Sequence, residues 1–130
     1  MIDRFLAFFL LILSSLPILV SCVLIILFDK SLPFFSQLRV GKNIKEFRIY
    51  KLKTMKIIYN EKNVSLTIRN DQRITLLGNC LRILKIDELP QLFNILIGEM
   101  KFIGPRPEIK ENLQDYPLKK KKILYQYYPG

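Results

Sequence analysis

Two adjacent carboxylates, Asp87 and Glu88, stand directly before an apolar run in the stretch KIDELPQLFNIL at residues 85–96. An ionised carboxylate held beside a bound phosphate and a divalent cation can attack phosphorus as a nucleophile. Two like charges side by side need a counter-charge, and Mg²⁺ is the usual one where phosphates are bound. A structural interpretation also fits, because Asp is a favoured helix N-cap residue and Glu is stabilised by the helix dipole.

The apolar run after this pair predicts the helix that would position it. We predict a helix over residues 88–97, with Asp87 as its N-cap, Pro90 in its first turn and Gly98 just past its end. The N-terminal N–H groups of such a helix could hold a phosphate. Its apolar stripe has the i, i+3, i+4, i+7 spacing of one helix face and comprises Leu89, Leu92, Phe93 and Leu96.

Four basic residues are candidates for binding phosphate near the carboxylates. Arg82 precedes the pair by five residues, and Arg106 is held between two prolines that fix the backbone on both sides. Lys51 and Lys53 alternate along a predicted strand, so we expect them to share one face. Each of the four also has an ordinary interpretation as a solvated side chain or an exposed turn residue.

The N-terminal stretch from Phe5 to Phe28 has 24 residues and no charged side chain. A helix of that length reaches about 36 Å, enough for a hydrocarbon core of about 30 Å. It could be a plain spanning anchor, a cleaved signal with a lipoprotein-like site at Cys22, or a helix that enters and leaves by one face. Pro17 removes a backbone donor, and nearby serines such as Ser15 could satisfy the freed groups, so a break is expected there.

The rest of the chain, residues 29–130, is long enough for one small domain and carries 20 basic against 10 acidic side chains. This surface suits anionic lipid or phosphate-bearing ligands, and its position after the apolar stretch favours the cytoplasmic side. The basic run at residues 117–122 is interpreted as a solvated or headgroup-facing patch. No nucleic-acid-binding motif is present, and the apolar N-terminal segment argues against that class.

Local patterns in this domain predict an α+β fold. Residues 34–55 read as two strands around a turn at Gly41–Asn43, and residues 59–72 as a loop. Residues 71–86 predict one short helix ending near Gly78 and a second beginning there. GPRP at residues 104–107 predicts a rigid turn.

Several segments resemble the bacterial sugar transferase family, the monotopic phosphoglycosyl transferases that are also called polyprenyl-phosphate sugar-1-phosphate transferases. They follow one another in the family's order from about residue 4 to residue 130. The most specific block runs from DELPQLFN to GPRP. The other segments are DKSLPFFSQLRVGKN, FRIYKLKTM and the closing YYPG.

The resemblance implies transfer of a sugar phosphate from a nucleotide diphosphate sugar, commonly a UDP-sugar, to a polyprenyl phosphate such as undecaprenyl phosphate. This reaction initiates capsule, exopolysaccharide, lipopolysaccharide or other glycoconjugate assembly. The resemblance implies that Asp87 is the nucleophile of a covalent phosphosugar intermediate, that Glu88 is its partner and that Mg²⁺ sits by Asp87. Arg82, Arg106 and Lys53 would lie around the phosphates.

The resemblance also implies an organisation in two parts. Residues 1–28 would form a re-entrant rather than spanning membrane helix, with its break near Ser15 and Pro17. Residues 29–130 would form a small catalytic α/β domain with amphipathic interface helices, at the cytoplasmic face of the bacterial inner membrane. Its partners would be the two substrates and the membrane, with no nucleic acid.

The final Pro129-Gly130 pair opens a further segment in the family. We therefore expect the catalytic domain to be truncated at its C-terminus. The alternative to an active transferase is an inactive, membrane-bound relic that binds lipid or a partner without turnover.

Overall fold

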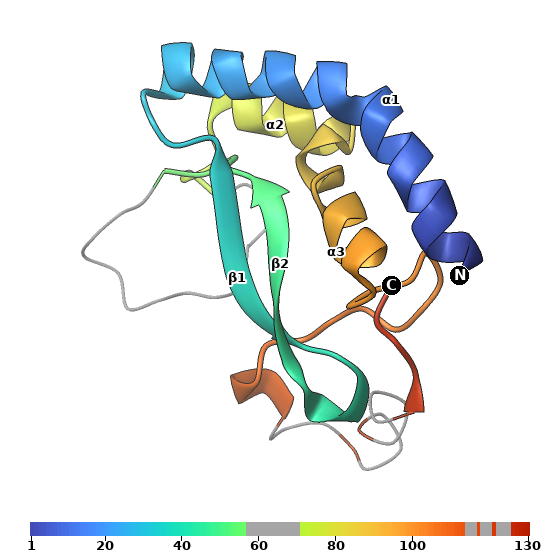
Figure 1. The fold of residues 1–130 in the computed structure, drawn as a ribbon. Helices are drawn as coiled ribbons and strands as arrows, with labels where there is room; N and C mark the ends of the chain where they lie inside the picture. Colours follow the sequence, from blue (N-terminus) through green and yellow to red (C-terminus); the bar gives the residue numbers. More distant parts are fainter. Residues whose placement is uncertain (57–70, 114–116, 118–120, 122–125) are drawn as a thin grey trace.

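The computed structural model describes residues 1–56, 71–113, 117, 121 and 126–130. Within them the fold is α+β with a long apolar N-terminal helix, as predicted (Figure 1). The predicted loop over residues 59–72 and the basic run at residues 117–122 lie mostly outside these residues. The main elements are α1 (Ile2–Leu24) with its π-helical continuation η1 (Ile25–Asp29), β1 (Phe34–Val40), β2 (Glu46–Leu52), α2 (Leu76–Ile83) and α3 (Gln91–Ile97). Short 3₁₀ turns are η2 (Lys42–Ile44), η3 (Ile86–Glu88) and η4 (Glu111–Leu113).

The helix formed by α1 and η1 is long and apolar enough, by length and composition, to cross a membrane. Only 17% of its most apolar window is buried inside the protein. Figure 1 shows it bending between two halves, and Pro17 lies inside it. Ser14 and Ser15 donate to carbonyl oxygens three residues earlier, at 3.3 and 2.6 Å. They therefore do not satisfy the carbonyl of Leu13, the group that Pro17 leaves without its usual donor.

Strands β1 and β2 form the predicted antiparallel hairpin, from the pair Phe34 and Leu52 to the pair Val40 and Glu46. The connection contains η2, in which Asn43 has a φ of 57°. Asn tolerates this left-handed conformation better than most residues, which explains its place in the turn.

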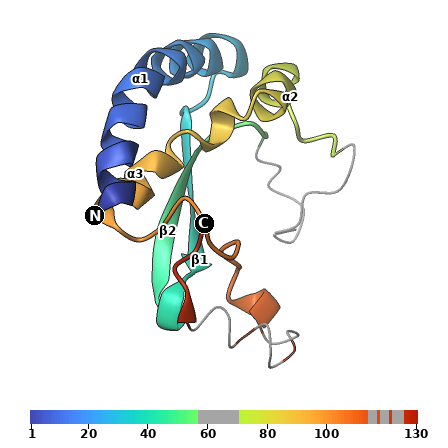
Figure 2. The same ribbon diagram turned by 90° about the vertical axis from the view of Figure 1, so that its right-hand side faces the viewer.

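Two apolar clusters attach the helices to β2. The first joins the N-terminal half of α1 to β2 and α3, and Figures 1 and 2 both show α3 beside that half of α1. The second joins the C-terminal end of the long helix to the end of β2 and to α2. The buried residues are Ala7, Phe47, Ile49, Ile95 and Met100 in the first cluster, and Ile25, Leu52 and Leu81 in the second.

The prediction of two helices meeting near Gly78 is wrong, because α2 runs through that glycine as one helix. The hydroxyl of Thr75 caps its start by accepting a hydrogen bond from the Gly78 N–H at 2.9 Å. A Cβ at Gly78 would overlap the carbonyl oxygen of Thr54, the second residue after β2. Gly78 therefore marks a close approach between α2 and the strand segment, not a helix end.

The segment 104–107 contains no helix or strand and packs against the last residues of the chain. The N–H of Gly130 donates to the carbonyl of Pro105 at 3.1 Å, and the N–H of Lys101 donates to that of Pro129 at 2.8 Å. Just beyond it, an isolated bridge between Val40 and Glu108 joins this segment to the end of β1.

Candidate active site

Asp87 and Glu88 lie in the 3₁₀ turn η3 between α2 and α3. The predicted N-cap role of Asp87 in a helix over 88–97 is therefore wrong, because α3 begins only after Pro90, which is its N-cap. Backbone N–H groups across this stretch bond to carbonyls three residues earlier, so the turn is tighter than an α-helix. The predicted end at Gly98 is confirmed, with a φ of 89° there.

Asp87 is buried, with 8% of its surface exposed. Its Oδ1 atom has no hydrogen-bond partner among the described residues. Burial raises the pKa of this carboxyl, and the charge of Glu88 raises it further, while Lys51, Arg82 and Lys85 act in the opposite direction. A desolvated carboxylate with an unused oxygen can accept a bond to an electrophile or a cation.

Glu88 has a different environment, since its Oε1 lies 2.8 Å from the Nζ of Lys51. Burial alone would raise its pKa, but the hydrogen bond and charge of Lys51, with the charges of Lys85 and Arg106, hold the pKa below the usual range. Glu88 is therefore ionised at neutral pH. Lys51 is not the solvent-facing lysine of the ordinary interpretation, because it pairs with a predicted site residue across 37 positions.

Arg82 and Lys53 are placed differently. The Nε of Arg82 donates to the hydroxyl of buried Thr54 at 2.8 Å, which fixes the guanidinium beside the end of β2. Its terminal nitrogens make no hydrogen bond to the described part of the chain, so they are available to a ligand. Lys53 lies just past the end of β2, where its backbone N–H donates to the carbonyl of Pro33 at 2.7 Å.

Arg106 is exposed in the 104–107 segment, and its charge acts on Glu88 from that side. Sequence reasoning missed Arg39, which holds this segment: its Nη1 donates to the carbonyl of Pro107 at 3.4 Å and its Nη2 to Gln37 at 2.7 Å. Burial, followed by the charge of Arg106, lowers the pKa of Arg39. The signal that could have found Arg39 is its alternation with Gln37 on β1.

Asn94 is the second residue that sequence reasoning missed. It is completely buried in α3, and its side-chain amide bonds to the backbone of β2. A polar amide inside the apolar run LFNIL was the available signal, because a buried amide must find partners. Ser15 and Pro17 lie in α1 and contribute no side chain to this site.

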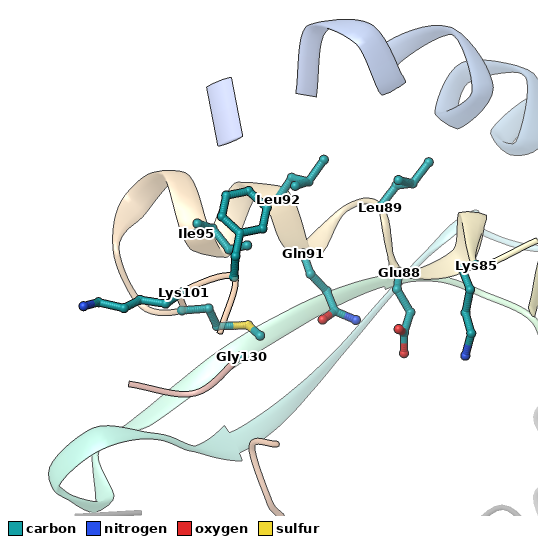
Figure 3. Close-up of a pocket in the computed structure, with 10 residues that line it drawn as sticks. Lys85, Glu88, Leu89, Gln91, Leu92, Ile95, Lys101 and Gly130 are labelled. Carbon is teal, nitrogen blue, oxygen red and sulfur yellow. The ribbon is translucent and has the colours of Figure 1, made fainter. Parts of the chain in front are cut away.

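A cavity of about 220 Å³ lies beside Glu88. Figure 3 shows Lys85, Glu88 and Gln91 pointing away from α1, whereas Leu89 and Leu92 point toward it. The part of the cavity wall near η3 is therefore polar. The other residues that line the cavity are Ile95, Met100, Lys101, Phe102 and Gly130.

The carboxylates Asp87 and Glu88 fit a hard divalent cation only in part. Among the described residues there is no group of three acidic, His or Cys side chains that could hold a metal. Mg²⁺ commonly binds through one or two carboxylates together with water and substrate phosphates. The unpartnered Oδ1 of Asp87 could supply one such ligand, and water and a phosphate substrate would have to supply the others.

Comparison with known proteins shows which sequences this chain is similar to. A sequence profile described as bacterial sugar transferase matches residues 1–130. A Bacillus subtilis (strain 168) protein, provisionally named undecaprenyl-phosphate N-acetylgalactosaminyl 1-phosphate transferase, is 44% identical over 72% of this chain and 53% of its own length. The UDP-glucose:undecaprenyl-phosphate glucose-1-phosphate transferase of Escherichia coli (strain K12) is 40% identical over 63% of this chain and 18% of its own.

A third relative is the exopolysaccharide production protein PSS of Rhizobium leguminosarum bv. phaseoli. It is 42% identical over 69% of this chain and 46% of its own length. The chain thus spans about half of the first relative and less of the other two.

Proposed function

Because the chain belongs to the bacterial sugar transferase family, we propose that it transfers a sugar-1-phosphate from a nucleotide diphosphate sugar to a polyprenyl phosphate. Undecaprenyl phosphate and a UDP-sugar are the substrates suggested by the names of its relatives. The observation that carries the proposal is the buried Asp87, whose Oδ1 is unpartnered, beside an ion-paired Glu88 and among cationic side chains.

The reaction has two displacements at phosphorus. A carboxylate oxygen of Asp87 attacks the sugar-bearing phosphorus of the donor, the bond to the bridging oxygen breaks, and UMP leaves with the electron pair. An oxygen of the polyprenyl phosphate then attacks the phosphosugar on Asp87. The Asp–phosphorus bond breaks, the carboxylate is regenerated, and a polyprenyl diphosphate sugar forms.

The two carboxylates have separate tasks in this proposal. Asp87 is the nucleophile, and Glu88, held ionised by Lys51, keeps a fixed negative charge beside it. Mg²⁺ bound at Asp87 would neutralise developing charge on the phosphates.

Cations around the carboxylates would hold the phosphates. Arg82 is fixed by Thr54 and offers its terminal nitrogens, and Arg106 approaches from the opposite segment. Lys53, just past β2, is the third cation in this proposal.

The long helix would place this chemistry at the membrane. The bend of α1 in Figure 1, in a helix that contains Pro17, fits a re-entrant helix with its break near Ser15 and Pro17 that would keep residues 29–130 on the cytoplasmic face of the bacterial inner membrane. The acceptor phosphate lies at headgroup level, so the nucleophile must be held at that depth.

Release of UMP tests the proposal. Membranes containing this chain would be supplied with Mg²⁺, undecaprenyl phosphate and a panel of UDP-sugars, beside an Asp87→Asn variant as matched control. We expect release that Asp87→Asn reduces by at least about 10³-fold, because the covalent step is lost. Release that persists in the variant would overturn the nucleophile assignment, and no release with any donor would favour the membrane-bound relic.

The pH dependence of the same assay provides a second test. Asp87 must be ionised to attack, and its pKa is raised by burial. The value of kcat/KM, which reports the free enzyme before Mg²⁺ and the donor bind, should therefore fall on the acid side at a pH above the ordinary aspartate range. An acid limb near or below pH 3.8 would contradict the role of Asp87.

A further inference from the structure

We propose that Asn94 is a positioning residue, whose buried amide fixes α3 against β2 in the register that brings Lys51 to Glu88. The proposal rests on the proposed function, since it explains how one carboxylate of that site is held. Asn94 has no exposed surface and touches neither Asp87 nor Glu88 through a hydrogen bond, so its action is indirect.

The amide of Asn94 bonds to β2 much as a peptide group of a neighbouring strand would. Its Oδ1 accepts from the N–H of Tyr50 at 3.2 Å, and its Nδ2 donates to the carbonyl of Arg48 at 2.6 Å. These two backbone groups lie on either side of Ile49, and both point to the edge of β2 away from β1. One side chain therefore covers an edge that would otherwise be open.

The bonded strand segment leads directly to the ion pair. Lys51 follows Tyr50, and Glu88 stands six residues before Asn94 on the continuous stretch formed by η3 and α3. Successive strand residues face opposite sides, so a slip of one residue would turn Lys51 away from Glu88. The amide selects the register in which the Nζ to Oε1 distance is 2.8 Å.

The other contacts of Asn94 keep the amide in a single orientation. Its Nδ2 also donates to Oε2 of Glu99 at 2.9 Å, just past the helix end. Its backbone carbonyl accepts from the N–H groups of Gly98, Glu99 and Met100. Both amide hydrogens and the amide oxygen are engaged, so an apolar replacement leaves strand groups buried without partners.

The charged groups around Glu88 predict the effect of losing this register. Lys51 faces it from β2, Lys85 from the preceding turn and Arg106 from the 104–107 segment, while Asp87 is its acidic neighbour. Without Lys51 at this distance, Glu88 loses the cation with which it forms an ion pair, so its side chain is no longer held in one position. The transfer rate should then fall without a matching change in donor binding.

The test compares Asn94→Leu with Leu96→Ala, a neighbour on α3 that packs on the first apolar cluster and does not line the cavity. We expect Asn94→Leu to lower kcat about 10- to 100-fold through misplacement, with little change in the donor Michaelis constant. Leu96→Ala should lower the unfolding temperature while leaving kcat nearly unchanged. An Asn94→Leu variant with the kcat of the unmodified chain would overturn the proposal.

A double-mutant cycle with Lys51→Met identifies the route of the effect. If Asn94 acts through Lys51, the double variant should show little loss of kcat beyond that of either single variant. Fully additive losses would overturn the proposal. If Asn94→Leu does not fold, Asn94→Ala replaces it, because it removes both amide bonds to β2 and adds neither volume nor charge.

The same cycle measured by thermal unfolding needs no turnover. Coupling between Asn94 and Lys51 in unfolding free energy, together with UMP release that does not need Asp87, would sink the proposed function and keep the register assignment. UMP release that needs Asp87, without coupling between Asn94 and Lys51, would support the proposed function and overturn the register assignment.

Discussion

The α3 side and the α2 side of the candidate site are joined to the same strand by opposite means. On the α3 side, the buried amide of Asn94 bonds to the backbone of β2. On the α2 side, Gly78 has no side chain, and the carbonyl of Thr54 occupies the space that a Cβ would need. The first joint depends on hydrogen bonds and the second on shape, yet Asp87 and Glu88 sit between them.

The two carboxylates between these joints also have different environments. Glu88 is paired with Lys51 and its pKa is lowered, whereas Asp87 is buried without a partner for Oδ1 and its pKa is raised. Opposite shifts in neighbouring carboxyls are a sign of separate roles. The tight η3 turn produces the difference, because consecutive side chains leave it in different directions.

The largest expected effect comes from adding one methyl group at Gly78, where α2 lies against the carbonyl of Thr54. Gly78→Ala places a Cβ against the Thr54 carbonyl oxygen, a backbone atom that cannot rotate away. We expect a loss of about 1–3 kcal/mol or more in unfolding free energy, as for other overpacked sites. Urea unfolding of the detergent-solubilised chain measures it.

The neighbouring substitution Asn79→Ala is the matched control, because Asn79 is exposed on the same helix. Alanine has the higher helix propensity, so stability should stay level or rise by a few tenths of a kcal/mol. Equal behaviour of the two variants would show that α2 does not rest on Thr54.

A smaller effect is expected from Thr54→Val, which keeps the backbone contact with Gly78 and removes the hydrogen bond from Arg82 to the Thr54 hydroxyl. The Nε of Arg82 loses its acceptor at 2.8 Å, so we expect a loss of about 1–2 kcal/mol in stability. The Michaelis constant for the donor sugar nucleotide should also rise, because the guanidinium is no longer fixed. Steady-state kinetics of UMP release measures this.

Thr54→Ser provides the control, since it retains the hydroxyl and loses only a methyl group. It should keep the donor Michaelis constant of the unmodified chain. A Thr54→Val variant with the same constant would show that Arg82 needs no support from β2.

Local patterns were enough to predict the hairpin and the end at Gly98. These features depend on alternation and on a glycine that can adopt a positive φ. The predicted apolar stripe was right only in part, because Leu92 and Leu96 pack on the first cluster while Phe93 is exposed. Asn94 and Ile95 are the buried residues of α3. The start of α3 was predicted wrongly, because an Asp before a proline resembles an N-cap. The structure instead makes a 3₁₀ turn there, after Lys85 takes a left-handed conformation.

The partners within the site could not be read from local sequence. Lys51 and Glu88 are separated by 37 positions, and only the packing of α3 on β2 brings them together. Gly78 was taken for a helix end because local sequence does not reveal which backbone will approach a glycine. The contacts of Arg39 with Pro107 and of Asn94 with β2 were missed for the same reason, since each joins positions distant in sequence.

The smallest effect is expected in the pH dependence of stability, measured by thermal unfolding of variants of two aspartates. Asp71 precedes α2 and accepts hydrogen bonds from Arg73, which lower its pKa to about 2. Its stabilising contribution is present above the ordinary value of 3.8 and is lost as the pH falls toward about 2. The stability difference between the unmodified chain and Asp71→Asn should therefore shrink as the solution is acidified.

Asp87 has the opposite sign. Its raised pKa means that the neutral form favours folding, so its contribution is full below pH 3.8 and is lost as the pH rises through the raised pKa. Relative to Asp87→Asn, the unmodified chain should gain stability as the pH falls through that window, while relative to Asp71→Asn it loses stability on further acidification. If the stability differences from Asp87→Asn and from Asp71→Asn changed in the same direction on acidification, the contrast between the two aspartates would be wrong. That contrast is between a paired carboxylate before α2 and an unpaired one in the η3 turn.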